Sequence, residues 1–356
     1  MTAPASRPHL LGLLPGELAA HLAAQGIAVR DDEARRLLAG VFTPGGAAVP
    51  RRKPVARRLH AAMAALTDDT RLEVLERATD PSDGFVKYLL RSPDGALSEA
   101  VRIPLHRPGA FSVCLSSQVG CAMGCAFCAT GRLGLTRHLA AWEMVAAFLA
   151  VRDEAPGRVT GAVFQGQGEP LANYDQVIQA ARVLSDPCGG KVAAKAITIS
   201  TVGLIPQIRR YTAEGHAYRL IVSLASALPE KRARLLPVAG RSSLGELAAA
   251  LREHAAATPG RLTVAWVLIG GVNSGADEAA ALRDLLGDVP LRLNLIDVND
   301  PRAGGFVRAS DAERHAFMDH LQILKAPVVR RYSGGAATHA ACGMLVGMRA
   351  EAGTAP

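Results

Sequence analysis

The chain has 356 residues, enough for one large domain or two smaller ones, so the size of the hydrophobic core is not limiting. About half of the residues are apolar (49%) and 20% are charged, which excludes an intrinsically disordered chain and is typical of a globular protein. The formal net charge of +8 fits a polyanionic partner such as RNA, although many proteins of other kinds are equally basic.

No secretory signal and no membrane span are predicted at the start of the chain. The apolar segment 9–24 is interrupted by Pro15, Glu17 and His21, and it lacks a basic stretch and a cleavage site. We therefore expect a protein of the reducing cytoplasm, without a membrane partner. In that compartment the six cysteines would serve a metal or catalysis rather than a disulfide scaffold.

Residues 1–95 predict a small, mainly helical accessory domain, and residues 96–350 predict the main domain. Apolar residues recur at helical spacing between residues 18 and 41. The strip PRRKPVARR at 50–58 carries five basic residues and two prolines, and it is either a solvated loop or an RNA contact. From 85 to 103 the pattern becomes extended, which predicts a hairpin leading into the main domain.

From residue 111 onward, segments of strand and helix character alternate in about six βα units. This alternation predicts an α/β fold with a parallel sheet, open or curved into a partial (βα)6 barrel, whose functional side chains gather at the carboxyl ends of the strands. The predicted strands cover residues 111–115, 159–165, 196–201, 218–224, 262–269, 291–296 and 328–331. The predicted helices include residues 141–152, 174–184, 204–214, 244–256 and 276–286.

The loop after the first of these strands reads SSQVGCAMGCAFCATG and spaces Cys121, Cys125 and Cys128 as C-x3-C-x2-C. Three thiolates can hold three irons of a [4Fe–4S] cube and leave the fourth open, whereas electron-transfer clusters use four cysteines. An open iron can bind S-adenosylmethionine (SAM) and pass it an electron, which yields a 5′-deoxyadenosyl radical. The alternative is a structural zinc site, but zinc needs four ligands, and His138 is the nearest further candidate.

Polar residues and glycines follow several other predicted strands. The sequence FQGQGEP at 164–170 would let a ligand approach the backbone, and the Glu169 carboxylate could accept hydrogen bonds from the SAM ammonium. Its alternative is a tight turn. Ser200, residues 223–225 and Asn299 also stand at strand ends, where each could be an ordinary polar residue. Their shared placement favours a ligand site.

Three cysteines lie outside the C-x3-C-x2-C loop. Cys114 falls within a predicted strand, Cys342 lies near the C-terminus in AACG, and Cys188 lies beside two glycines. Free cysteine usually behaves as a small buried apolar residue, and this remains the alternative for each of them.

Seven motifs, in this order, resemble the radical-SAM RNA methyltransferases that act on adenine in large-subunit ribosomal RNA. They are SSQVGC-x3-C-x2-CATG, GxGEP, ISTVGLIP, VSLA, VLIGGVN, NLIxxN and AACG. The resemblance implies that Cys121, Cys125 and Cys128 bind a [4Fe–4S] cluster. It also implies that SAM is contacted by Gly168, Glu169, Ser200, Ser223, Leu224, Ala225 and Asn299.

The resemblance further implies a methyl carrier. Cys342 would be methylated on sulfur by one SAM, and the radical from a second SAM would take a hydrogen from that methyl group. After the methylene radical adds to the adenine ring, Glu99 would accept the ring proton. Attack by Cys114 would then release the methylated base and leave a Cys114–Cys342 disulfide. The implied product is adenosine methylated at carbon 2 in 23S ribosomal RNA or in a transfer RNA.

The chain departs from the family pattern at three places on the substrate side. Gln167 replaces the usual methionine of GMGEP, Ala225 replaces the usual histidine after VSL, and GGAATH at 334–339 replaces an acidic run. The alternatives therefore include methylation at carbon 8, another RNA, a small-molecule substrate, and a non-catalytic iron–sulfur or zinc module that binds RNA. An electron-donor protein such as flavodoxin or ferredoxin is the further implied partner.

Overall fold

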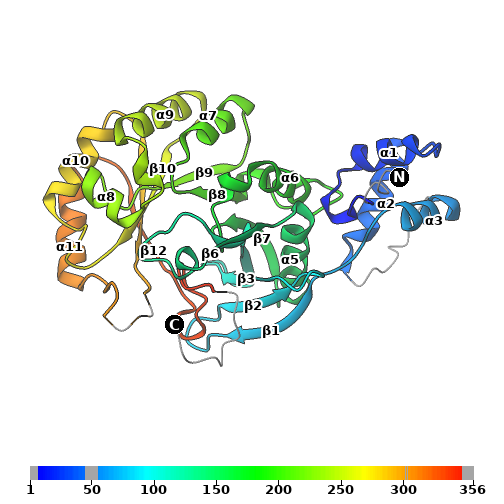
Figure 1. Cartoon of the computed structure of the whole chain (residues 1–356), viewed down its shortest axis with the longest axis horizontal. Helices are drawn as coiled ribbons and strands as arrows, with labels where there is room; N and C mark the ends of the chain where they lie inside the picture. The colour runs from blue at the N-terminus through cyan, green and yellow to red at the C-terminus, as the bar shows by residue number, and fades with distance from the viewer. Residues whose placement is uncertain (1–6, 45–54, 301, 303, 347–356) are drawn as a thin grey trace.

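The computed structural model describes residues 7–44, 55–300, 302 and 304–346. The chain begins with a group of helices, followed by a large sheet whose strands alternate with further helices (Figure 1). The first group is η1 (Leu10–Gly12), α1 (Pro15–Ala24), α2 (Asp31–Val41) and α3 (Arg57–Leu66). Residues 50–54 of the basic strip lie outside the described residues.

One sheet contains ten strands, and their spatial order follows the order along the chain. The strands are β1 (Glu73–Thr79), β2 (Val86–Arg91), β3 (Leu97–Pro104), β4 (Ala110–Leu115), β7 (Arg158–Phe164), β8 (Ile197–Thr201), β9 (Arg219–Ser223), β10 (Leu262–Leu268), β11 (Leu291–Asp297) and β12 (Val328–Arg331). Neighbours from β1 to β4 are antiparallel. Neighbours from β4 to β12 are parallel.

Helices connect the parallel strands and cover one face of the sheet. They are α5 (Ala141–Glu154), α6 (Tyr174–Ser185), α7 (Ile205–Glu214), α8 (Pro229–Leu235), α9 (Leu244–Ala257), α10 (Ala276–Leu286) and α11 (Asp311–His320). Six crossovers of this kind lead from β4 to β12 in the described chain, and the sheet keeps two separate edge strands, β1 and β12. The predicted α/β fold with a partial (βα)6 barrel is therefore confirmed, and the antiparallel strands extend it at one edge.

The alternation of side chains along each strand separates the core from the other face. On β4, Val113 and Leu115 enter the main hydrophobic core under the helices, whereas Cys114 between them faces the opposite side. On β7, Phe164 enters the same core and Val163 faces the opposite side. The second face is thus free to carry a pocket at the strand ends.

The N-terminal helices pack against α5 and α6 and share the main core with them. The His9 ring stacks on Trp142 of α5 with ring centroids 4.1 Å apart. Gln179 of α6 donates to the Gly12 carbonyl at 2.9 Å. Figure 1 shows these helices at one end of the molecule, away from the C-terminal segment.

The predicted domain boundary at residue 95 lies in the turn between β2 and β3. These strands pair with each other, for example Leu89 with Glu99, so segments from both predicted domains share one sheet. The division into two domains stays a prediction. Within the described ranges, no helix is long and apolar enough to cross a membrane.

Candidate functional site

A pocket lies at the carboxyl ends of the parallel strands, on the face opposite the helices. Its walls come from strand ends far apart in sequence, including those of β4, β7, β8, β9 and β11, together with the C-terminal segment. Predicted site residues that line it are Cys114, Cys121, Cys125, Cys128, Gly168, Glu169, Ser200, Ser223, Asn299 and Cys342. Folding therefore gathers most of the predicted site into one space.

The three-cysteine loop follows β5 (Gln118–Cys121) and leads into the short helix α4 (Ala129–Arg132). Cys121 and Cys125 are buried, and Cys128 is half-buried. The loop backbone is held from outside, because the Ala126 N–H donates to the Leu235 carbonyl at 3.0 Å and the Ala126 carbonyl accepts from Arg302 at 3.1 Å. These contacts present all three thiols to the same pocket.

The chemistry of this donor set fits an iron–sulfur cube. Burial raises the pKa of Cys121 to about 11, and burial together with the neighbouring thiols raises the pKa of Cys125 further. The cationic iron–sulfide core of a cluster would displace these protons when the thiolates bind it. In the described part of the chain, no three His, Cys, Asp or Glu side chains are grouped as ligands of a single metal ion. A cube binds each thiolate through a different iron, so it does not need such convergence.

The GxGEP loop brings a buried carboxylate to the pocket. The Oε1 atom of Glu169 accepts from the Leu171 N–H, and Oε2 accepts from the Val202 N–H, both at 2.9 Å. Burial raises the pKa of Glu169 to about 7, and these hydrogen bonds oppose that shift. A carboxylate has further acceptor positions, so Glu169 keeps the capacity to bind an ammonium group.

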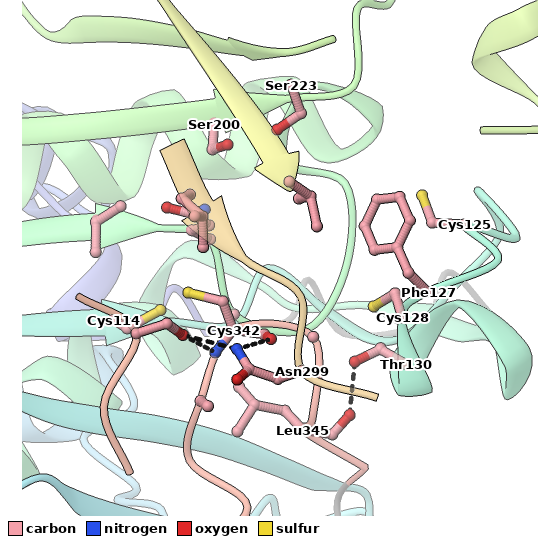
Figure 2. A pocket seen from close by; sticks show the side chains of 18 of the residues that line it. Cys114, Cys125, Phe127, Cys128, Thr130, Ser200, Ser223, Asn299, Cys342 and Leu345 are labelled. Carbon is pink, nitrogen blue, oxygen red and sulfur yellow. Dashed lines mark hydrogen bonds between the residues drawn. The ribbon is translucent and has the colours of Figure 1, made fainter. Parts of the chain in front are cut away.

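The strand-end residues divide into two groups. Ser200 and Ser223 line the pocket (Figure 2), whereas Leu224 and Ala225 are buried and do not line it. The Leu224 N–H donates to the Ala265 carbonyl at 3.0 Å, and the Ala225 carbonyl accepts from Asn273 at 2.7 Å. In this structure both residues join neighbouring strand ends rather than face the cavity.

Asn299 lines the pocket, but its side chain is engaged with the C-terminal segment. Its Nδ2 donates to the Cys342 carbonyl at 3.3 Å and to Ser333 Oγ at 3.0 Å, and its Oδ1 accepts from Arg308. The Cys342 N–H also donates to Ser333 Oγ at 3.0 Å. Asn299 and Ser333 thus fix the backbone of Cys342.

Cys114 of β4 and Cys342 of the segment after β12 lie beside each other in the pocket (Figure 2). Both are free thiols, Cys114 buried and Cys342 exposed. Burial, followed by the neighbouring Cys342, raises the pKa of Cys114 to about 12. Figure 2 shows this pair on one side of the pocket and Cys125 and Cys128 on the other.

Glu99 does not line the pocket, although it lies on the same face of β3 as Val101 and Ile103, which do. Its carboxylate forms an ion pair with Lys87 at 3.2 Å, and both side chains are buried. Lys87 carried no signal in the sequence, because a single lysine in an extended pattern is usually solvent-exposed.

Ser333 was also missed by the sequence analysis. It stands after β12, and the rule that selected polar residues at other strand ends would have selected it there. Gln167 and Ala225, two departures from the resembled pattern, do not line the pocket, whereas Gly334 of the third departure does. Of the three, only the C-terminal segment reaches the cavity.

Comparisons with known proteins agree with this geometry. A model of the Radical SAM superfamily matches residues 115–282. A probable RNA methyltransferase of Anaeromyxobacter sp. (strain Fw109-5) is 56% identical over 270 residues, 75% of this chain and 79% of the relative. The dual-specificity RNA methyltransferase RlmN of Syntrophobacter fumaroxidans is 38% identical over 325 residues, 90% of this chain and 94% of the relative. The crystal structure of a radical SAM methyltransferase from Sphaerobacter thermophilus, 35% identical, matches with a TM-score of 0.86 over 96% of this chain and 100% of that one.

Proposed function

Since the chain belongs to the radical-SAM RNA methyltransferases of the RlmN type, which use SAM and a [4Fe–4S] cluster, we propose that it methylates carbon 2 of an adenosine in 23S ribosomal RNA. A transfer RNA adenosine is a further substrate for the same chemistry. The observation that carries the proposal is the presence of Cys114 and Cys342 in the pocket that also holds the three-cysteine loop.

We assign the cluster to Cys121, Cys125 and Cys128. When bound, the cluster and SAM supply a 5′-deoxyadenosyl radical. Residues assigned to SAM are Gly168, Glu169, Ser200, Ser223, Leu224, Ala225 and Asn299. In this assignment Glu169 accepts hydrogen bonds from the ammonium group, and the buried Leu224 and Ala225 shape the wall behind Ser223. An electron-donor protein such as flavodoxin or ferredoxin would reduce the cluster.

Cys342 is the proposed methyl carrier. Its exposed thiol is accessible to a methyl donor and to a base, and its backbone is held by Asn299 and Ser333. Cys114 is the proposed releasing group, since its thiol lies beside Cys342 on the wall of the same pocket. Its sulfur forms a bond to Cys342 Sγ while the bond from Sγ to the transferred carbon breaks, and that carbon keeps the electron pair and takes a proton.

Glu99 is the proposed acceptor of the adenine ring proton. Its buried ion pair with Lys87 holds the carboxyl group on the face of β3 from which Val101 and Ile103 line the pocket. The Glu99→Gln variant should still methylate Cys342 and should form no methylated RNA. Peptide mass spectrometry detects the first product and nucleoside mass spectrometry the second. Normal RNA methylation by this variant would exclude Glu99 as the base.

The test of the whole proposal is the nucleoside composition of ribosomal and transfer RNA from a deletion strain. We expect 2-methyladenosine to be absent and to be restored by the wild type and by Cys188→Ala, whose site lies away from the pocket. Cys342→Ala should not restore it, and Cys114→Ala should leave RNA covalently bound to the protein. Restoration by Cys342→Ala would refute the carrier mechanism. A loss of 8-methyladenosine would move the target to carbon 8, and unchanged RNA would indicate a small-molecule substrate.

A further inference from the structure

Arg232 of α8 is a buried cation without a carboxylate partner among the described residues. Its residue exposure is 2%, and it forms no ion pair there. Nη1 donates to the Leu224 carbonyl at 2.6 Å, and Nη2 donates to the Val202 carbonyl at 2.8 Å. Nε is buried and has no hydrogen-bond partner. Among the described residues, the guanidinium therefore has carbonyl acceptors but no partner that carries a formal negative charge.

A buried charge without a counter-ion is costly, so its surroundings should supply an anion. The helix that carries Arg232 packs on the three-cysteine loop, because Leu235 and Leu236 share an apolar cluster with Cys121 and Cys125. The Leu235 carbonyl of this helix also accepts from the N–H of Ala126, the residue after Cys125, at 3.0 Å. Burial lowers the pKa of Arg232 to about 10, so the group stays charged at neutral pH. With metal bound, the cysteine loop that packs on this helix would be such an anion.

We propose that Arg232 is a positioning residue whose buried charge compensates the cluster held by Cys121, Cys125 and Cys128 and favours its reduced state. Reduction adds one negative charge to the cluster, and a fixed cation in a water-poor site stabilises the more negative state. Removal of that cation should therefore lower the reduction potential. This inference depends on the cluster assignment made above.

The same residue also connects two strand ends assigned to SAM. The Val202 carbonyl follows β8, which carries Ser200, and the Leu224 carbonyl follows β9, which carries Ser223. If Arg232 had only a structural role, it would act through these hydrogen bonds, and its charge would not affect the reduction potential of the cluster. The reduction potential of a variant that keeps the charge separates the two roles, because Arg232→Lys alters these hydrogen bonds but keeps the cation.

The experiment is a redox titration of the anaerobically reconstituted full-length protein, followed by electron paramagnetic resonance. Arg232→Met removes the charge and keeps an apolar stem, Arg232→Gln removes it and keeps a donor, and Arg232→Lys keeps the charge. Arg234→Met, an exposed position on the same helix, is the matched control. Iron and sulfide content and circular dichroism report assembly and folding.

At a fixed applied potential, the ratio of reduced to oxidised cluster should fall about tenfold or more in Arg232→Met and Arg232→Gln, which corresponds to roughly 59 mV per tenfold change. Arg232→Lys and Arg234→Met should stay close to the wild type. An unchanged potential in an iron-loaded neutral variant would overturn the proposal. A lowered reduction potential in Arg232→Lys would also overturn the proposal, because this variant keeps the charge. The Arg232→Lys result tests the proposal even if the neutral variants do not fold. A wild type without iron on these cysteines would refute the cluster assignment itself, and iron analysis alone identifies that outcome.

Discussion

Gly168 shows how one backbone position decides the shape of the proposed SAM site. Its φ is +99°, a region that L-residues with a side chain rarely adopt. A Cβ atom there would lie 2.6 Å from the Gln118 Cβ. The Gln118 Oε1 accepts the Glu169 N–H at 2.8 Å, so the same contact sets the position of the carboxylate.

Gly168→Ala should therefore destabilise the protein by roughly 1–3 kcal/mol from backbone strain alone and weaken SAM binding. The measurements are chemical unfolding and equilibrium binding of SAM to the reconstituted protein. Gly16→Ala is the matched control, because Gly16 is helical and a Cβ there meets no atom within 4 Å. Equal stability of Gly168→Ala and Gly16→Ala would contradict this prediction.

Cys114 provides a prediction of pH dependence. Burial raises its pKa to about 12, so at any neutral or mildly alkaline pH the folded protein contains less thiolate than the unfolded chain. In a Cys188→Ala, Cys342→Ala background with the cluster assembled, the rate of alkylation of Cys114 should rise about tenfold per pH unit and continue to rise above pH 9. In denaturant the rate should level off near the ordinary cysteine pKa of about 8.5.

Alkylation followed by peptide mass spectrometry gives both rate profiles for Cys114. The decisive quantity is the pH at which the alkylation rate stops rising. Restricted access to the thiol slows the reaction at every pH but does not change that pH. A folded profile that levels off below pH 10 would show that burial does not hold the thiol protonated.

At the scale of elements, the segment after β12 is held by the loop between β1 and β2. The Asp83 Oδ2 atom accepts from the Tyr332 hydroxyl at 3.0 Å and from the Gly335 N–H at 2.8 Å. Asp80 accepts from the Ala337 N–H at 3.0 Å. The segment that replaces the acidic run of the resembled family is thus bound by acidic residues from another part of the chain.

Asp83→Ala should release this segment and increase backbone hydrogen exchange across residues 332–345. The loss of charge-assisted hydrogen bonds costs roughly 1–3 kcal/mol each, and RNA methylation should fall because Cys342 is no longer held in place. Asp69→Ala, at an exposed position outside this loop, is the control. Unchanged exchange in the segment would show that Asp83 does not hold it.

At the scale of the whole molecule, one of the residues that contribute to the net charge of +8 lies at the pocket. Arg331 is exposed, ends β12 and lines the pocket. A phosphate neutralised there would release counter-ions, so RNA affinity should fall with salt.

Arg331→Ala should weaken RNA binding and reduce the slope of log K against log salt by about 0.7–0.9, the contribution of one phosphate contact. Fluorescence anisotropy with a labelled RNA fragment at several salt concentrations measures both quantities. The control is Arg283→Ala on α10, an exposed arginine paired with Asp284. An unchanged slope would exclude a phosphate contact at Arg331.

The family membership also operates at this scale, since it rests on nearly the whole chain. The relatives align over 75% and 90% of its length, and the solved structure matches 96% of it. The family establishes the class of chemistry. The methylated atom and the RNA substrate are parts of the proposal, and the nucleoside analysis tests them.

The sequence by itself determined the features that depend on local spacing. The alternation of strand and helix character predicted the curved parallel sheet, because the period of apolar residues sets the secondary structure. The spacing of Cys121, Cys125 and Cys128 predicted the cluster loop, because ligand reach depends on a few bonds of chain.

Only the tertiary structure decided the contacts that depend on closure of the sheet. It brought Cys342 beside Cys114, placed Leu224 and Ala225 behind the pocket wall, and paired Lys87 with Glu99. It also buried Arg232 on the helix whose Leu235 and Leu236 pack against the cysteine loop. Such contacts join segments that are distant along the chain, and no local pattern records which buried face a distant strand or helix will meet.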